Sequence, residues 1–311
     1  MTKRILKIGT RGSPLALVQA NMVKQALEEA HKELEVQIVP IKSKADWQKG
    51  QEEKALDEAG GGKGQFASEI EAQILSGDID CGVHSLKDMD SFLAKGLTIK
   101  HVLPRADARD VFISSQYKSI EELPAGATVG TCSQRRAALV LSINPNVEIL
   151  PFRGNVDTRL EKIRAGQVDA TLLAKAGLDR LGLAPQEATI LETEKFMPAC
   201  GQGIVCLEVC EDDLETHTLL APIHCEETGY AMMAERRVLQ MLNGSCHTPI
   251  GAYASIRKGE MTLKALVASN DGQNLYREEK TIEVRSNEQA LECGEAVGQA
   301  LREIVPPDLL K

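Results

Sequence analysis

Short apolar runs alternate with longer amphipathic stretches at the start of the chain. The run Ile5–Gly9 predicts a strand, and the stretch after it predicts a helix that ends near His31. Ser13 and Pro14 are residue types that begin helices, with serine as the N-cap and proline at the first helical position. A second strand is predicted at Val36–Lys42. Strand, capped helix and strand form the unit of an α/β sheet, and the free amides at such a helix start attract anions.

A long polar segment then interrupts the pattern at Ser43–Gly64. It ends in several glycines, which do not suit a regular element, and it predicts a mobile loop. A binding lid and simple surface disorder explain such a loop equally well. The pattern resumes with an amphipathic helix at Phe66–Leu75 and strands at Asp80–Ser85 and Leu97–Leu103.

The strand and helix pattern restarts after the crossing segment Pro104–Asp107. The predicted strands are Asp110–Ser114, Thr128–Thr131, Val147–Pro151 and Ala170–Ala174, and the predicted helices are Cys132–Ile143, Val156–Ala165 and Lys175–Leu181. A return segment at Phe196–Gly203 leads into the apolar strand Ile204–Val209. One lobe is therefore discontinuous, with the second inserted into it. Two-lobed proteins that close on a ligand by hinge motion have this layout.

The last third of the chain predicts a small α+β domain. This domain follows a helical stretch around Glu211–Leu220. Its helices are expected at Glu227–Leu242 and Glu288–Ile304, and its strands at Ile250–Ile256, Met261–Val267 and Leu275–Val284. We expect three domains in 311 residues, a length beyond which one core rarely grows. Their predicted bounds are 1–103 with 198–222, then 104–197, then 223–311.

Composition and charge exclude several classes of function. A net charge of −9 argues against a general nucleic-acid binder, although local basic clusters can still bind a small anion. No apolar run approaches the roughly 18 residues that span a bilayer, and residues 1–5 lack a signal-peptide core. We therefore expect a cytoplasmic protein without membrane or nucleic-acid partners. The eight cysteines form no Cys-x-x-Cys pair, which favours reduced thiols over disulfides and predicts no metal site.

Charged residues gather where strands end and helices begin. Lys87 and Asp88 follow a buried strand, at the edge where α/β sheets bind ligands, although a solvated surface turn is the common alternative. Two helices carry arginines in or near their first turn, where the helix dipole disfavours cations. An anionic ligand explains these arginines better than helix stability does. The alternative is that the arginines at both helix starts are simply exposed to solvent.

One cysteine, Cys246, stands apart from the others because it lies in the glycine and proline turn Leu242–Ala252. A thiol on a turn is accessible, whereas Cys81 and Cys206 lie inside apolar runs. Most free cysteines are small buried hydrophobes, and this remains the alternative for Cys246.

Several motifs, in order along the chain, give a resemblance to the porphobilinogen deaminase (hydroxymethylbilane synthase) family. They are Ile8–Ala16 (IGTRGSPLA), Val83–Met89 (VHSLKDM), Arg153–Leu160 (RGNVDTRL), Ala176–Gly182 (AGLDRLG), Gly201–Gly203 (GQG) and the Cys246 turn leading into Thr248–Tyr253 (TPIGAY). Each motif alone is weak, but together they cover essentially the whole chain.

The resemblance implies two periplasmic-binding-protein-like α/β lobes with a third small α+β domain. It implies an enzyme of tetrapyrrole biosynthesis that condenses four porphobilinogen molecules and releases ammonia at each step. Since the sequence shows no obvious exposed amphipathic stripe to spare, we expect a monomer. The chain would grow on a dipyrromethane cofactor joined by a thioether to Cys246, with Asp88 as the catalytic carboxylate. The implied cofactor- and substrate-binding residues are Arg11, Ser13, Gln19, Lys63, Phe66, Ser85, Lys87, Ser133, Arg135, Arg136, Arg153, Asn155, Arg159, Arg180 and Gln202.

The chain departs from the common family pattern at several positions. Beside the anchor, Asn243 and Ser245 replace a glutamate and a glycine. Ser43-Lys44-Ala45-Asp46, followed by Trp47, replaces a Thr-Thr-Gly-Asp turn. Cys132-Ser133-Gln134 replaces a Ser-Ser-Leu, and Cys200 a proline or valine. Lys175 stands where a small apolar residue is common and predicts a further cation beside Arg180. Since Asp88 and the arginines are present, we still expect an active enzyme.

Two other functions fit parts of the sequence. The two lobes and the arginines also suit a cytosolic receptor for a small polycarboxylate without catalysis, because a fold alone does not determine activity. Such a receptor has no use for Asp88 or Cys246. A metal-dependent enzyme that uses His84 is disfavoured, because the six histidines show no ligand spacing.

Overall fold

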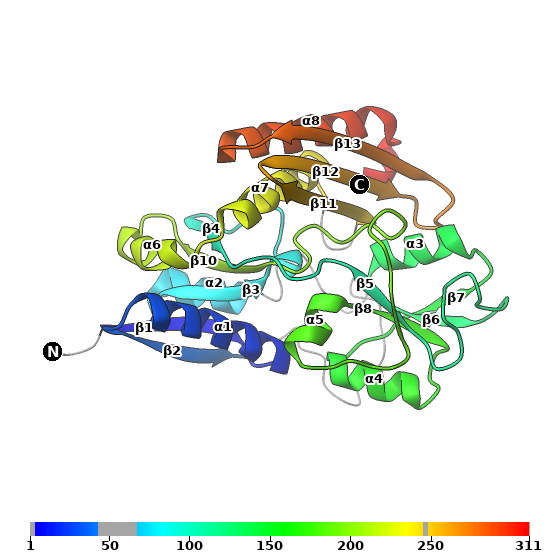
Figure 1. Cartoon of the computed structure of the whole chain (residues 1–311), viewed down its shortest axis with the longest axis horizontal. Helices are drawn as coiled ribbons and strands as arrows, with labels where there is room; N and C mark the ends of the chain where they lie inside the picture. Colours follow the sequence, from blue (N-terminus) through cyan, green and yellow to red (C-terminus); the bar gives the residue numbers. More distant parts are fainter. Residues whose placement is uncertain (1–3, 43–66, 245–247, 311) are drawn as a thin grey trace.

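The first lobe is built on a five-stranded mixed sheet with the strand order β2-β1-β3-β10-β4 (Figure 1). The computed structural model describes residues 4–42, 67–244 and 248–310. The strands are β1 (Arg4–Arg11), β2 (Leu34–Ile41), β3 (Cys81–Ser85), β4 (Leu97–Val102) and β10 (Val205–Cys210). β1 runs parallel to β2 and β3, whereas β10 runs antiparallel to β3 and β4. The sheet thus takes β10 from a distant part of the sequence.

Helix α1 (Pro14–Ala30) begins as its sequence predicts, with the Ser13 hydroxyl accepting a hydrogen bond from the Ala16 amide at 3.4 Å. Its buried face, with Val23 and Leu27, packs on the sheet. The other helices of this lobe are α2 (Ser68–Ser76) and α6 (Leu214–Leu220). The predicted start of α6 at Glu211 is wrong by three residues, because the Asp213 carboxylate caps the Thr216 amide at 3.0 Å.

The second lobe repeats the plan, with the strand order β7-β6-β8-β5-β9. Its strands are β5 (Asp110–Ile113), β6 (Thr128–Gly130), β7 (Glu148–Leu150), β8 (Ala170–Ala174) and β9 (Ala188–Ile190), and its helices are α3 (Gln134–Ile143), α4 (Val156–Arg164) and α5 (Lys175–Arg180). The sequence pattern did not predict β9. Phe112 and Leu139 lie at the centre of one core cluster of this lobe, and neither is exposed.

The two segments that cross between the lobes lie against each other. The Ala106 amide donates to the Gly203 carbonyl at 3.1 Å, and the Leu103 amide to the Val205 carbonyl at 3.0 Å. Gly203 has φ +88°, and a Cβ there would lie 2.5 Å from the Ala106 carbonyl oxygen. Only glycine fits this close approach of two backbones.

The third domain is a three-stranded antiparallel sheet covered by two helices (Figure 1). It comprises β11 (Ile250–Arg257), β12 (Glu260–Ala268), β13 (Leu275–Glu283), α7 (Glu226–Met241) and α8 (Asn287–Ile304). A Cβ on Gly294 of α8 would lie 2.3 Å from the Ala234 carbonyl, so the two helices pack closely. Short 3-10 turns form at η1 (Leu86–Asp88), η2 (Ala221–Ile223) and η3 (Pro307–Leu310). The predicted fold class, two α/β lobes and a small α+β domain, is confirmed.

A buried ion pair joins the third domain to both crossing segments. Arg105, in the first crossing, pairs with Glu235 of α7, and its Nε donates to the Gln202 carbonyl at 2.9 Å. Glu235 is not exposed to solvent, and its carboxylate also accepts the Gly201 and Ala254 amides, each at 2.7 Å. All three domains therefore meet at one carboxylate.

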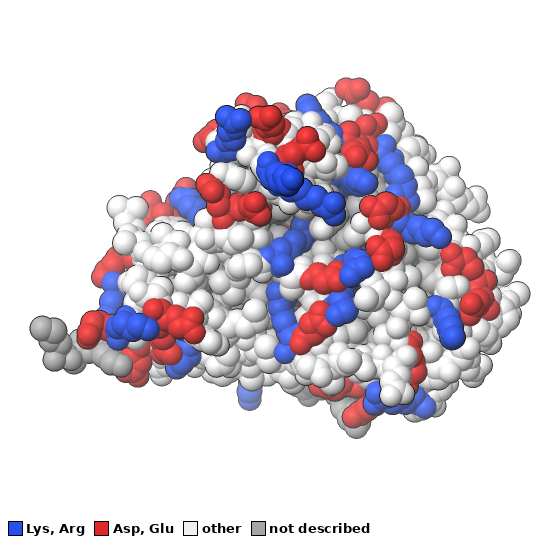
Figure 2. Space-filling view, in the orientation of Figure 1, with Lys and Arg blue, Asp and Glu red and all other residues white. Residues whose placement is uncertain are grey.

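The surface carries charges of both signs. On the face shown in Figure 2, blue and red side chains lie interspersed among uncharged ones, without one large field of a single sign. Among the described residues, no helix is both long and apolar enough to cross a membrane.

Candidate active site

A cavity of about 670 Å³ lies where the two lobes face each other. Its walls come from the β1–α1 turn, the end of β3 with η1, the starts of α3 and α4, helix α5 and the return segment. Of the residues predicted to form the site, the cavity is lined by Arg11, Ser13, Gln19, Ser85, Lys87, Asp88, Arg136, Arg153, Asn155, Arg159 and Arg180. These residues are far apart in the sequence, and the fold brings them around one space.

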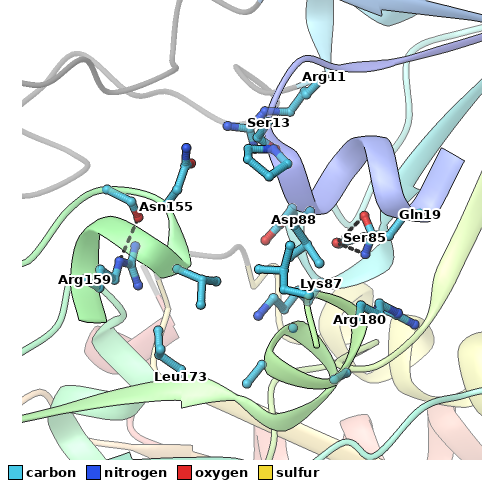
Figure 3. Close-up of a pocket in the computed structure, with 18 of the residues that line it drawn as sticks. Arg11, Ser13, Gln19, Ser85, Lys87, Asp88, Asn155, Arg159, Leu173 and Arg180 are labelled. Atoms are coloured by element: carbon cyan, nitrogen blue, oxygen red, sulfur yellow. Dashed lines mark hydrogen bonds between the residues drawn. The ribbon is translucent and has the colours of Figure 1, made fainter. Parts of the chain in front are cut away.

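Asp88 is an exposed member of this group, as is Asn155. It is the last residue of η1, directly after the buried strand β3, and Figure 3 shows it facing the open space between α1 and α4. Asp88 and Ser13 also line a smaller cavity of about 60 Å³ beside the main one. The carboxylate is therefore accessible to a ligand in the cavity.

Lys87 lines the same cavity, and its side chain also approaches the buried Gln202 behind the wall. Its Nζ lies 3.5 Å from Oε1 of Gln202, which is not exposed. The pKa of Lys87 is lowered to about 8, chiefly by burial; Asp88 opposes this shift and the nearby Arg136 guanidinium adds to it. At neutral pH the side chain is a cation, but it loses its proton more easily than an ordinary lysine.

The first lobe contributes hydrogen-bonding side chains from α1 and β3. Gln19 donates from Nε2 to the Ser85 hydroxyl at 2.8 Å, and the two residues stand together in Figure 3. The Ser85 hydroxyl donates back to Oε1 of Gln19 at 3.2 Å. This pair fixes the end of β3 to the first turns of α1, next to Arg11 and Ser13.

The second lobe contributes cations. Arg159 donates from Nε to the Gly154 carbonyl at 2.9 Å, which folds it back along the start of α4. Arg180 donates from Nη2 to the Gly203 carbonyl at 2.7 Å and so reaches the return segment. Burial lowers the pKa of Arg180, and its buried Nε has no hydrogen-bond partner among the described residues. An unpaired guanidinium nitrogen at a cavity wall fits an anionic ligand.

The two arginines at the start of α3 have an internal partner that the sequence did not reveal. Asp110, which is fully buried, lies 2.8 Å from Nη2 of Arg135 and 2.7 Å from Nη2 of Arg136. Burial alone would raise the pKa of Asp110, but the two guanidinium groups lower it to about 2. An external anion is therefore not needed to explain these arginines, because a buried carboxylate pairs with both, although Arg136 also faces the cavity.

Arg135 and Arg136 differ in their access to the cavity. Arg136 lines it, whereas Arg135 does not and donates to the Met197 carbonyl at 2.6 Å. Gln202 is also absent from the wall, and its Nε2 donates to Oδ1 of Asp110 at 3.2 Å. Ser133 is the N-cap of α3 and accepts from the Arg136 amide at 3.4 Å. Three predicted residues thus lie behind the lining of the cavity and not in it: Arg135, Ser133 and Gln202.

Three predicted residues, Lys63, Phe66 and Cys246, lie outside the described residues. No disulfide joins any of the seven described cysteines to another. Burial raises the pKa of the Cys81, Cys200 and Cys206 thiols well above the ordinary value, which makes them poor nucleophiles.

The cavity also contains residues that sequence reasoning missed. Lys42 directly follows β2, which ends beside the neighbouring strand β1. Ligands bind at the carboxyl ends of strands in α/β sheets, so the position of Lys42 after a predicted strand could have indicated it. Asp157 lies in the first turn of α4, where the helix dipole favours an acid. Cys132 precedes the cap of α3, and its Sγ accepts from the Phe152 amide at 3.2 Å. No motif marked Cys132 as a site residue.

Two of the family departures have simple structural outcomes. Lys175 forms an ion pair with Asp179 one turn later and does not line the cavity, so the expected extra cation beside Arg180 is neutralised. Asn243 adopts a left-handed backbone with φ +51°, which asparagine tolerates better than most residues. The change at Asn243 is therefore compatible with the local fold.

Comparison with known sequences identifies the same family. The model described as "Porphobilinogen deaminase, dipyromethane cofactor binding domain" matches residues 6–218, and the model described as "Porphobilinogen deaminase, C-terminal domain" matches residues 230–303. The porphobilinogen deaminase of Nitrobacter winogradskyi is 45% identical over 277 residues, which cover 88% of this chain and 86% of the relative. That of Syntrophobacter fumaroxidans is 41% identical over 304 residues, covering 97% and 95%.

Among solved structures, the BvgS periplasmic VFT2 domain of Bordetella pertussis gives a TM-score of 0.44 at 12% identity, covering 75% of this chain and 92% of that domain. The two matched family models and the identities of 41–45% over most of the chain show that the protein belongs to the porphobilinogen deaminase family.

Proposed function

We propose that the protein is a hydroxymethylbilane synthase, a transferase that joins four porphobilinogen molecules head to tail and releases ammonia at each step. The observation that carries this proposal is a cavity in which cations surround the exposed carboxylate of Asp88, with a second exposed carboxylate, Asp157, at the start of α4. Each porphobilinogen carries an acetate and a propionate, so a growing chain adds two negative charges per ring. Arginines suit this task because a guanidinium pairs with a carboxylate through two parallel hydrogen bonds.

The cavity fits the dipyrromethane cofactor of the family. Its volume of about 670 Å³ lies within the usual range for ligand sites, and the buried Nε of Arg180 lacks a partner among the described residues. The residues proposed to hold the carboxylates of the cofactor and substrate are Arg11, Ser13, Lys87, Arg136, Arg153, Asn155, Arg159 and Arg180. When bound, the cofactor supplies the pyrrole carbon to which the first substrate is added.

Asp88 is proposed to move the protons of the reaction. A carboxylic acid here can protonate the amine that leaves the substrate, and the resulting carboxylate stabilises the positive charge that develops there. The same oxygen can then accept the proton released from the pyrrole carbon. Gln19 and Ser85 support this role, because their hydrogen bonds hold the end of the strand that leads to Asp88.

The residues behind the cavity wall are proposed to orient Arg136 and Lys87; they are Ser133, Arg135 and Gln202. Lys63 and Phe66 stay proposals from the resemblance alone. A pure receptor for polycarboxylates is not favoured, because the Asp88 carboxylate weakens the binding of anions and a receptor gains nothing from it.

The mass of the intact purified protein tests the proposal. We expect one dipyrromethane adduct, located by peptide mapping on the peptide that contains Cys246. Cys246→Ser should abolish the adduct. Cys132→Ser is the matched control, because Cys132 is the described thiol that lines the cavity, and this variant should keep the adduct. A wild-type protein without an adduct would contradict the proposal.

The pH dependence of substrate binding tests the role of Lys87. Because its pKa is about 8, the ammonium that attracts a carboxylate is present below pH 8 and is lost above it. We expect KM to rise steadily between pH 8 and pH 10 in the wild type. Lys87→Arg should flatten this rise, because arginine stays charged throughout the range. Titration of the substrate amine affects both proteins equally, so identical profiles would exclude Lys87 as the cause.

We also propose that the enzyme works as a monomer in the cytoplasm, without nucleic-acid or membrane partners. Both lobes that line the cavity belong to the same chain, which supports a monomer. Sedimentation of the holoenzyme at micromolar concentration should give a mass close to 33.8 kDa.

A further inference from the structure

Helix α7 of the third domain packs against the segment that carries Asp88. Met232 and Met233 of α7 lie in one apolar cluster with Leu86 and Met89. Leu86 begins η1 and Met89 directly follows it, so the cluster holds both ends of the short turn that contains Asp88. The third domain is therefore in contact with the catalytic segment of the first lobe.

Two polar side chains of α7 hold the backbone just beyond that turn. Arg236 donates from Nη2 to the carbonyl of Asp90 at 2.8 Å and to that of Ser91 at 3.2 Å. One helical turn later, Nε2 of Gln240 donates to the Ser91 carbonyl at 3.0 Å. Since Ser91 is 3% exposed, these bonds form away from water, where a lost donor leaves a carbonyl unpaired.

The guanidinium of Arg236 is held in place by its surroundings. Burial lowers the pKa of Arg236, while nearby negative charges, including those of Glu208 and Asp90, oppose the shift. A cation is costly to bury without such compensation, so the side chain is committed to this site. We call the Arg236 and Gln240 contacts to residues 90 and 91 the α7 clamp.

The same helix leads directly to the proposed cofactor-bearing turn. α7 ends at Met241, five positions before Cys246. The Asn243 amide donates to the Gln240 carbonyl at 3.2 Å, and the Gly244 amide to the Leu239 carbonyl at 2.9 Å. A Cβ on Gly244 would lie 2.5 Å from Cδ1 of Ile250, so the start of the turn is packed closely on its own domain.

We propose that Arg236 and Gln240 are positioning residues, through which α7 fixes Asp88 relative to the cofactor-bearing turn. This inference rests on the function proposed above, because it assigns no new chemistry. The cations of the cavity come from other elements, so loss of the clamp should leave substrate binding intact and slow the chemical step. A shift of about 1 Å in a catalytic group is enough to lower turnover roughly a hundredfold.

Arg236→Met and Gln240→Leu test the clamp in the holoenzyme. The matched control is Arg237→Met, which removes the same charge from the next residue of α7. Arg237 pairs with Glu295 of α8 at 2.7 Å, and its Nη1 donates to Oε1 of Gln240 at 3.5 Å, so both contacts stay inside the third domain and neither uses the Nε2 of Gln240 that forms the clamp. The measurements are kcat and KM per cofactor-loaded molecule, with loading from intact mass, and amide hydrogen exchange of the peptide that spans residues 86–93.

We expect Arg236→Met to lower kcat about tenfold or more with KM nearly unchanged, and to speed exchange in residues 86–93 by a similar factor. Gln240→Leu should show a smaller effect of the same kind, and Arg236→Lys should recover part of the loss. Arg237→Met should change neither quantity. Because Gln240→Leu removes no charge, it keeps the test valid even if Arg236→Met fails to fold.

A kcat in both clamp variants equal to that of Arg237→Met would overturn the proposal. So would a fall in kcat without faster exchange in residues 86–93, or a rise in KM alone. If the wild-type protein carries no dipyrromethane, the proposed function fails instead, and the exchange comparison still reports whether the clamp holds its segment.

Discussion

Replacing Asp88 with asparagine is expected to lower kcat about a thousandfold, within the range that general acid–base groups contribute. Asparagine keeps the size of the side chain but cannot give a proton to the leaving amine or carry the charge that stabilises the developing cation. KM should change little, because the carboxylates of the substrate bind to the cations of the cavity. The measurement is steady-state product formation per cofactor-loaded molecule.

Asp157→Asn provides the matched control. Asp157 is a second carboxylate in the wall of the same cavity, in the first turn of α4. If the wall only needs negative charge, both variants should lose activity equally, and Asp88 would lose its special role. Asp88→Glu should retain part of the activity, since it keeps the acid and moves it by one methylene.

The largest loss of stability is expected from Glu235→Ala. This change removes the partner of Arg105 and leaves the Gly201 and Ala254 amides without their acceptor, all in the interior. Breaking one side of a buried ion pair typically costs about 3–5 kcal/mol. Urea unfolding followed by circular dichroism should show a much lower midpoint for this variant.

Glu295→Ala is the control for this experiment. Glu295 also pairs with an arginine of α7, but its side chain is 53% exposed, so the pair contributes about 1 kcal/mol or less. Equal shifts of the midpoint in the two variants would show that the contact between the three domains adds nothing beyond an ordinary ion pair.

Local signals predicted most of the elements. Ser13 and Pro14 marked the start of α1, and the alternation at Met261–Val267 marked a strand that the structure extends to Glu260–Ala268. The end of a buried strand also indicated Lys87 and Asp88 as candidates. These features depend on neighbours in the sequence, which periodicity and capping rules describe.

Partners distant in the sequence could not be predicted in this way. Asp110 precedes Arg135 by 25 positions, and only the packing of β5 against α3 brings them together. The same holds for Arg236, whose acceptors at residues 90 and 91 belong to another domain. A charged residue in a sequence therefore indicates a need for a partner, but the fold decides whether that partner is internal or a ligand.

The position of β10 has a consequence for synthesis on the ribosome. In the first sheet β10 lies between β3 and β4, yet it is translated after every strand of the second lobe. Until residue 210 has emerged, β3 and β4 each have an edge with unpaired backbone groups, whereas β5 to β9 can already pair with one another. The second lobe can thus close first, and the half that carries Asp88 is completed only when the nascent chain returns to it.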